Sequence, residues 1–355
     1  MYRLEFRVER RCEWLALRIA FARKSGPTVL VRDPGGRLRI QMDRAVPLAV
    51  VHEEARYCGE LAVPGPIPPG VWGVRFCADP GEYEFSWEGG TGPPPEAGGP
   101  DCGPLERWSD AAAPVGPGPL ELNVYPWERE LKSGRKWYKG DFHVHTDLSD
   151  GKPSPRERLR QAEAFGLDFF AATDHCVLPA AWPSGGVLVI PGTEVTSEQG
   201  HFNAIGIRRW IDWTADAADG GMDTEEGMNR LLAETAAAGG IRAINHPLLA
   251  PWAWRFGETL LERVDCLEIW NDPTYPKNPA ATERALRLWN VLWNDGRRVW
   301  GIGGSDVHNN PDDAYTPGGP PSVIGDPATY VLADGLSAAG ILRAVRAGRA
   351  YVSRG

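Results

Sequence analysis

From about residue 137 to the C-terminus, the sequence alternates between strand-like and helix-like segments, and this alternation constrains the fold more than any other feature. Such a pattern is typical of a mainly parallel sheet whose strands are connected through helices. About seven strands carry the repeat, so we expect a closed or nearly closed α/β barrel, with its chemistry on loops after the carboxyl ends of the strands. The expected strands are 141–145, 167–173, 186–192, 201–207, 241–246, 265–270 and 298–304, with later ones at 328–333 and 350–353.

Two helix starts in this region carry capping signals. Ser154-Pro155-Arg156-Glu157 matches a capping box with Pro at the first helical position, and predicts a helix to about Phe165. Asp223-Thr224-Glu225-Glu226 is expected to cap a second helix that ends at Gly239-Gly240. Two further helices are expected over about 280–293 and 341–347.

The first 130 residues have a different pattern. Short segments rich in β-branched and aromatic residues are separated by Gly- and Pro-rich turns, as at 63–70, which is typical of an all-β sandwich. A stretch dominated by Gly and Pro, 89–118, is expected to be a loop. We therefore expect a β-sandwich-like domain over 1–130 and an α/β barrel over 137–355.

Composition excludes some partners and compartments. The net charge is −9, and an acidic chain is not expected to bind nucleic acid or anionic membranes as a stable partner. We find neither a signal-peptide pattern nor an apolar run of the ~20 residues that a membrane span requires, so a cytoplasmic protein is expected. The six cysteines are scattered without a C-x-x-C pair and are interpreted as reduced, buried thiols.

The histidines are concentrated where strands are expected to end. Six of the seven lie between residues 143 and 308, and only His52, which we interpret as structural, lies earlier. His143 and His145 are two residues apart in an expected strand, so their side chains should share one face. Carboxylates are interleaved with these histidines. The candidate metal ligands are His143, His145, Asp150, His175, Glu194, His201, His246, Asp306 and His308.

This residue set indicates a metal centre. Neutral imidazole and carboxylate together suit zinc, manganese or iron, and no thiolate is needed. A single histidine in a strand is more often a packed core residue than a ligand. That interpretation does not account for six histidines at successive strand ends with acids between them, so the pattern predicts a metal-dependent hydrolase.

The same residues resemble the successive motifs of the PHP (polymerase and histidinol phosphatase) superfamily. The resemblance covers about residues 137–310, and its lead-in, WYKGDFHVHTDLSDG, is more similar to the CehA/McbA-type branch. The matching motifs are HVHT at 143–146, SDG at 149–151, TDH at 173–175, Glu194, GH at 200–201, NHP at 245–247 and GSDVH at 304–308. The resemblance implies a distorted (β/α)7 TIM-like barrel that binds about two or three divalent ions, zinc, manganese or iron, with magnesium as a further candidate.

The resemblance also distributes the ligands among three ions. It implies that the first ion is held by His143, His145, Glu194 and Asp306. Glu194 would bridge to a second ion, which is completed by His201 and His246. The third ion would be held by Asp150, His175 and His308. Asp150 stands where some relatives carry a histidine, and the harder oxygen ligand favours manganese or magnesium at that site.

The implied activity is cleavage of a small organic phosphate ester. Two ions that share Glu194 would lower the pKa of a bridging water and generate hydroxide at neutral pH. Asp306 and His201 are the catalytic candidates, with Asp306 as a possible acceptor of the water proton. Candidate substrate contacts are Trp252, Arg255 and Asn271. The Pro- and Gly-rich segment 309–327 is expected to form a lid.

Other functions remain open at this stage. A carboxyl or carbamate ester hydrolase could use the same multinuclear site, and aromatic rim residues favour it, whereas an arginine clamp would favour a phosphate ester. A non-catalytic binding protein with a degenerate barrel and an exonuclease are further alternatives. The complete ligand set argues against the former, and the acidic charge argues against the latter.

Overall fold

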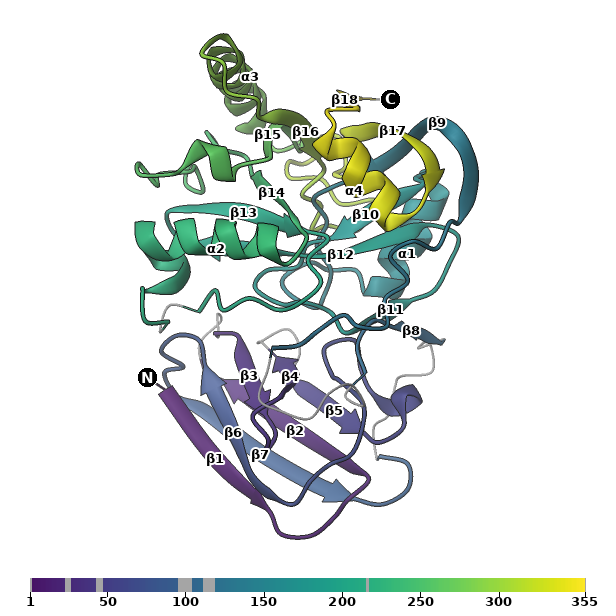
Figure 1. Ribbon diagram of the computed structural model, residues 1–355, viewed down its shortest axis with the longest axis vertical. Coiled ribbons are helices and arrows are strands. Elements are labelled where there is room, and N and C mark those ends of the chain that lie inside the picture. The colour runs from purple at the N-terminus through teal and green to yellow at the C-terminus, as the bar shows by residue number, and fades with distance from the viewer. Residues whose placement is uncertain are drawn as a thin grey trace. The chain divides into compact units, whose positions relative to one another are not determined.

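The computed structural model describes residues 2–22, 27–42, 47–94, 104–110, 119–214 and 217–354. The chain divides into two compact units (Figure 1). The first unit consists of Met1–Pro126, Val177–Ser184 and Arg208–Asp216. The second consists of Trp127–Cys176, Gly185–Ile207 and Ala217–Gly355. Two short segments from the later half of the sequence therefore belong to the first unit, which a single division near residue 130 does not anticipate.

The first unit is built from antiparallel strands. A four-stranded sheet has the order β1-β6-β3-β4, formed by β1 (Tyr2–Val8), β6 (Gly70–Phe76), β3 (Val29–Arg32) and β4 (Leu38–Met42). A three-stranded sheet has the order β5-β2-β7, formed by β5 (Leu48–His52), β2 (Trp14–Phe21) and β7 (Tyr83–Gly90). β8 (Leu105–Arg107) pairs with β11 (Ala181–Pro183), and η1 (Ala55–Tyr57) is a short 3-10 helix.

One apolar core draws side chains from both of these sheets. Trp72 and Phe6 come from the four-stranded sheet, and Leu17 and Val51 come from the three-stranded sheet. Along β6 every second residue is buried, as expected for a strand that turns one face to a core. His52 is buried at the end of β5, and its Nδ1 accepts a hydrogen bond from the Glu54 backbone N–H, so it has the structural role that the sequence suggested.

The second unit is built around a nine-stranded sheet with the order β16-β15-β14-β13-β12-β10-β9-β17-β18. The sheet is nearly closed, because β16 and β18, at the two ends of this order, lie next to each other. The strands are β9 (Lys132–Asp141), β10 (Phe169–Ala172), β12 (Leu188–Ser197), β13 (Gly200–Ile205), β14 (Ile241–Ile244), β15 (Cys266–Asn271), β16 (Trp300–Gly304), β17 (Ala328–Leu336) and β18 (Ala350–Ser353).

The strands of this sheet are less uniformly parallel than the sequence predicted. The pairings β9–β10, β10–β12, β14–β15 and β15–β16 are parallel. The pairings β12–β13, β13–β14, β9–β17 and β17–β18 are antiparallel. Only residues 198 and 199 connect β12 to β13. A parallel crossover needs a dozen or more residues, so this connection forces a hairpin.

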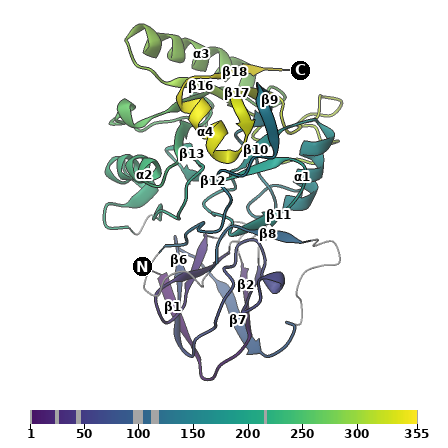
Figure 2. The same ribbon diagram turned by 45° about the vertical axis from the view of Figure 1, so that its right-hand side comes forward.

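Four helices accompany the sheet, and Figures 1 and 2 show α1 and α2 on opposite sides of it. They are α1 (Pro155–Ala164), α2 (Glu225–Ala237), α3 (Asn278–Asn294) and α4 (Ala338–Arg346), with short 3-10 helices η2 (Gly221–Asp223) and η3 (Leu261–Arg263). In the part of the chain that the structure describes, no helix has the length and apolar character needed to cross a bilayer.

Local signals predicted the start of α1 correctly. The Ser154 Oγ accepts a hydrogen bond from the Glu157 N–H, and the Glu157 carboxylate accepts one from the Ser154 N–H, which is a complete capping box. At α2 the capping residue is Thr224, not Asp223, because Asp223 lies in η2 and the Thr224 hydroxyl accepts from the Gly227 N–H. The signal was therefore correct to within one residue.

Candidate metal centre

The nine candidate ligands come together in the second unit from segments far apart in the sequence. His143 and His145 follow the end of β9 rather than lying inside it, and Val144 between them forms an isolated bridge to Val307. His175 follows β10, and His246 follows β14. Asp306 and His308 follow β16. These positions agree with the expectation that ligands follow the carboxyl ends of strands.

Glu194 and His201 are positioned differently, by the hairpin of β12 and β13. Glu194 lies in the middle of β12 instead of at its end, because β12 continues to Ser197 in register with β13. Thr196 pairs with His201 in this register, so Glu194 and His201 are diagonal neighbours on one face. The His201 Nδ1 lies 3.2 Å from the Glu194 Oε1. The hairpin therefore supplies both members of this ligand pair.

Glu194 is the centre of the cluster. Its carboxylate is fully buried, and each oxygen is shared by more than one imidazole. Oε1 lies 3.2 Å from His143 Nε2, 3.2 Å from His201 Nδ1 and 3.5 Å from His246 Nε2. Oε2 lies 2.8 Å from His175 Nδ1 and 3.6 Å from His145 Nε2. One carboxylate surrounded by five imidazoles has the arrangement expected of a bridging ligand.

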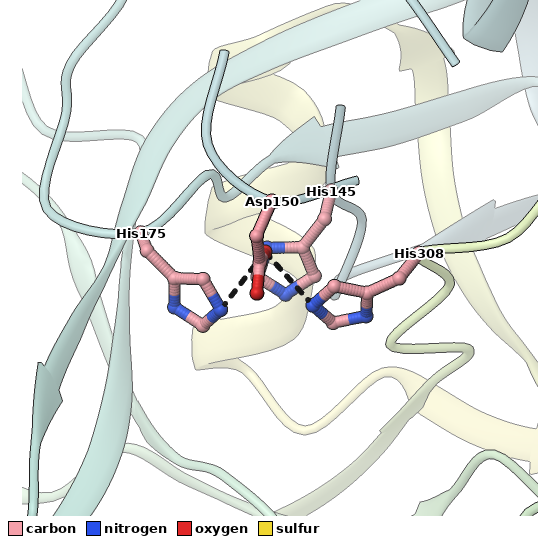
Figure 3. A group of neighbouring side chains, drawn as sticks. All are labelled: His145, Asp150, His175 and His308. Carbon is pink, nitrogen blue, oxygen red and sulfur yellow. Dashed lines mark ion pairs between the residues drawn. The ribbon is translucent and has the colours of Figure 1, made fainter. Parts of the chain in front are cut away.

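Two aspartates complete the cluster. The Asp306 Oδ1 lies 3.1 Å from His145 Nε2 and 3.2 Å from His143 Nε2. The Asp150 Oδ1 lies 3.4 Å from His175 Nε2 and 3.2 Å from His308 Nε2 (Figure 3). Asp150 is the most exposed of the candidate ligands, with 52% of its side chain accessible, so its side of the cluster faces solvent.

Among the described residues, four overlapping groups could each hold an ion, with all ligand atoms of a group within 4.8 Å of one another. They are His145, Asp150, His175 and His308; His143, His145 and Glu194; His143, His246 and Asp306; and Glu194, His201 and His246. The last group has the composition that the resemblance implied for the second ion. The first adds His145 to the implied third site, and Figure 3 shows its four side chains pointing toward a common centre.

The buried polar atoms of this cluster test whether a metal ion fits. Both ring nitrogens of His145 and the Nε2 of His143 have no hydrogen-bond partner, although carboxylate oxygens lie close to them. A buried polar atom without a partner is costly. Coordination would satisfy the lone pair that a neutral imidazole carries on one of its ring nitrogens, and the set of imidazole nitrogens and carboxylate oxygens suits divalent ions. The residues present therefore fit a metal centre.

The protonation states of two candidate ligands, His145 and Asp150, suit metal binding. Burial, together with the neighbouring His308 and His175, lowers the pKa of His145 to about 3, so its ring is neutral at physiological pH. Although burial opposes it, the hydrogen bond from His308 and the nearby His175 lower the pKa of Asp150 below its usual range. A neutral imidazole and an ionised carboxylate are the forms that bind metal.

Glu268 is a functional residue that sequence reasoning missed. It lies in the middle of β15 and is buried, and its Oε1 lies 3.0 Å from His143 Nδ1. Its Oε2 accepts hydrogen bonds from the His246 N–H and the Asn271 side chain. A carboxylate on the far nitrogen of a ligating histidine fixes the orientation of the ring. The available signal was a single acid inside the otherwise apolar strand segment 266–270.

Backbone strain is concentrated at this site. Among the described residues, the non-glycine residues with positive φ are Cys176 (51°), His246 (27°) and Asp306 (51°). His246 and Asp306 are candidate ligands, and Cys176 directly follows His175. Such conformations are unfavourable for residues with a Cβ and often occur at functional sites. Cys176 itself is buried, belongs to none of the four ligand groups, and has its pKa raised to about 12 by burial.

A cavity of about 280 Å³ opens onto the cluster. Trp252 and Asn271, two of the predicted substrate contacts, line it. Arg255 does not, because its guanidinium donates to the Glu198 carbonyl in the β12–β13 turn. Tyr315 and Asn309, from the predicted lid segment, also line the cavity. The full lining is Asp150, His175, Glu194, His201, His246, Leu249, Trp252, Asn271, Asp272, Tyr275, Asn278, Asp306, His308, Asn309 and Tyr315.

Comparison with protein-family models gave no match, and neither did comparison with curated sequences. Several solved structures are similar. One is a two-domain protein of Bacteroides vulgatus described as containing a predicted PHP-like metal-dependent phosphoesterase, which is 23% identical with a TM-score of 0.43. That match covers 62% of this chain and 66% of the other, just under two thirds of its length.

Two other similar structures are more distant in sequence. PsfC of Pseudomonas syringae is 16% identical with a TM-score of 0.43, over 62% of this chain and 92% of that chain. A lesion-specific endonuclease of Pyrococcus furiosus is 13% identical with a TM-score of 0.38, over 61% of this chain and 58% of that chain. The chemistry proposed below rests on the side chains of this chain.

Proposed function

We propose that this protein is a metal-dependent hydrolase, and more specifically a phosphoesterase that cleaves small organic phosphate esters. The observation that carries the proposal is the position of Glu194, whose two oxygens lie among five imidazoles while Asp150 and Asp306 complete the surrounding groups. This donor set supports zinc, manganese or iron as the bound ions. We also propose that the metal cluster lies in a PHP-type (β/α)7 barrel, that an N-terminal sandwich precedes this barrel, and that the protein is related to the CehA/McbA-type branch.

In this proposal the bound ions, Asp306 and His201 have different tasks. Divalent ions bound here would lower the pKa of a coordinated water and offset the negative charge that develops on the ester. Asp306 lines the cavity and acts as the proton acceptor, and the Asn271 amide, 3.3 Å from Asp306 Oδ2, holds it in place. His201 lines the cavity beside Glu194, where it would contact the reacting group of a bound ester.

Metal removal provides the first test. Exhaustive chelation should abolish hydrolysis of p-nitrophenyl phosphate, and zinc, manganese or iron added singly should restore it. His145→Ala should lower kcat/KM by more than the roughly 10- to 100-fold that loss of an outer partner of a ligand costs. His52→Asn, at the buried histidine of the first unit, is the matched control and should retain full activity. Hydrolysis that persists after complete metal removal would contradict the proposal.

A carboxyl or carbamate ester hydrolase is the second candidate, and one observation favours it. In the described part of the chain, neither arginine nor lysine lines the cavity, so no guanidinium or ammonium group is available to clamp a phosphate. The two functions separate when one metal-loaded sample is assayed with p-nitrophenyl phosphate, bis-p-nitrophenyl phosphate and 1-naphthyl acetate. The cavity volume suits a small molecule, which disfavours an exonuclease.

A further inference from the structure

One part of the cavity lining is aromatic. Trp252, Tyr275 and Tyr315 line it, together with the aliphatic Leu249. The rings form a chain, since the centroids of Trp252 and Tyr275 are 6.1 Å apart and those of Tyr275 and Tyr315 are 5.2 Å apart in an edge-to-face arrangement. Trp252 is 41% exposed, so part of its ring remains uncovered by protein. An exposed ring surface in a cavity can stack on a planar ligand.

Asp272 is the ionisable side chain beside these rings, and its carboxylate is fully engaged. Oδ2 accepts hydrogen bonds from the Tyr315 hydroxyl at 2.8 Å and from the Ser322 hydroxyl at 2.9 Å. Oδ1 accepts one from the Thr274 N–H at 2.9 Å. Burial and the adjacent Asp272 raise the pKa of Tyr315, so the phenol keeps its proton and remains a donor. Asp272 therefore positions Tyr315, and its carboxylate oxygens are occupied by hydrogen bonds within the protein and not by a ligand.

These hydrogen bonds attach the segment that carries Tyr315 to the end of β15. Asp272 follows the last residue of β15, and both Tyr315 and Ser322 belong to the predicted lid segment. A bridge between Ala314 and Pro321 and an ion pair between Lys152 and Asp313 further constrain this segment. The Tyr315 ring is thus placed before any ligand arrives, which reduces the entropy lost on binding.

We propose that Trp252, Tyr275 and Tyr315 form an aromatic wall that selects esters with a planar, uncharged aromatic leaving group, and that Asp272 is the positioning residue for Tyr315. This proposal rests on the proposed hydrolase function and names the substrate class. Water adds across the bond between phosphorus and the aryl oxygen, the leaving oxygen takes up a proton, and a phenol and phosphate are released, so no other reactant is needed.

The first experiment compares two esters whose leaving alcohols have similar acidity but different shapes, phenyl phosphate and hexafluoroisopropyl phosphate. The metal-loaded protein should prefer the phenyl ester in kcat/KM. Tyr315→Leu and Tyr275→Leu should each lower this preference by roughly three- to tenfold, the effect expected from loss of one aromatic contact. Tyr2→Leu, at an exposed tyrosine of the first unit, should leave the preference unchanged. Equal preference in the parent protein and both wall variants would overturn the proposal.

The test of Asp272 as a positioning residue needs a measurement that distinguishes loss of positioning from a general loss of structure. The comparison of KM and kcat for the two esters is such a measurement. Asp272→Asn weakens the hydrogen bond and Tyr315→Phe removes it, but both variants keep the ring. Each should raise KM for phenyl phosphate with little change in kcat, and should leave both parameters for the fluoroalkyl ester unchanged. Parallel losses for the two esters would show that Asp272 only stabilises the fold, and would overturn this role.

Measuring the binding of an aromatic product tests the aromatic wall without requiring hydrolysis. The result therefore distinguishes an error in the aromatic wall from an error in the proposed hydrolase function. Calorimetry on metal-free protein should show that 1-naphthol binds more tightly than decahydro-1-naphthol, and that Tyr315→Leu removes the difference. This result supports the aromatic wall even if no phosphate ester is hydrolysed. Hydrolysis of both esters without a preference for 1-naphthol would leave the hydrolase function intact and would overturn the wall.

Discussion

The His143 ring is held between two carboxylates, with Glu268 Oε1 3.0 Å from its Nδ1 and Glu194 Oε1 3.2 Å from its Nε2. The two ring nitrogens therefore have different tasks. Glu268 contacts Nδ1 and orients the ring, while Nε2 is turned toward the candidate metal centre. Although burial opposes it, the carboxylates of Asp306, Glu268 and Glu194 together raise the pKa of His143 well above its ordinary value.

Glu268→Gln tests this relationship. The amide keeps the size of the side chain but removes its charge, so the His143 Nδ1–H donates to a neutral acceptor instead of an anionic one and the ring becomes a weaker ligand. We expect metal affinity to fall by roughly 10- to 100-fold, measured by competition with a chromophoric chelator. Glu283→Gln on α3 is a matched control, because this acid is exposed and outside the cluster. Unchanged affinity in the Glu268 variant would show that Glu268 does not orient His143.

Gly304→Ala should disturb the same ligand from the backbone side. A Cβ at Gly304 would lie 2.5 Å from His143 Cβ and 2.9 Å from its N, closer than atoms pack. We expect the variant to lose about 1–3 kcal/mol of stability and to bind metal more weakly. The control is Gly73→Ala in β6, where no atom lies within 4 Å of the added Cβ. Similar unfolding and metal-binding curves for the two variants would contradict the expected displacement.

Glu194 should contribute to the binding of more metal ions than His308 does. Glu194 belongs to two of the four candidate groups, whereas His308 belongs to one. Elemental analysis of purified variants should therefore show that Glu194→Gln loses more metal per chain than His308→Ala, provided that both remain folded by circular dichroism. Equal losses in the two variants would argue against Glu194 as a shared ligand.

The thiols should be unreactive in the folded protein. Cys12, Cys58, Cys77, Cys176 and Cys266 are buried and form no disulfide, and Cys102 lies outside the described residues. Burial raises the pKa of Cys58 and of Cys266, which lowers their thiolate fractions at any given pH. We expect neither to be alkylated by iodoacetamide at pH 8 until urea unfolds the chain, with peptide mass spectrometry as the measurement. Rapid alkylation of the native protein would refute the interpretation of inert thiols.

Local sequence signals predicted the secondary structure well where it is determined by contacts between residues that are close together in the sequence. The Ser154 and Glu157 capping box lies within four residues, and it correctly placed the start of α1. The alternation after residue 137 likewise indicated strands and helices at nearly the right positions. The direction in which strands pair is decided by contacts between distant segments and by connection lengths. The antiparallel β12–β13 hairpin was therefore not anticipated, and Glu194 was expected at a strand end instead of mid-strand.

The amino-acid sequence by itself determined which residues could bind metal, because imidazoles and carboxylates recur at segment ends and no other part of the chain has such a pattern. Only the tertiary structure decided which of their atoms lie close together and which other side chains hold them in position. Glu268 and Asp272 are single acids without a local motif, and Tyr315 is one tyrosine in a Pro- and Gly-rich segment. Their roles arise from hydrogen bonds to residues between 43 and 125 positions away, and a relationship of that kind leaves no trace in a short stretch of sequence.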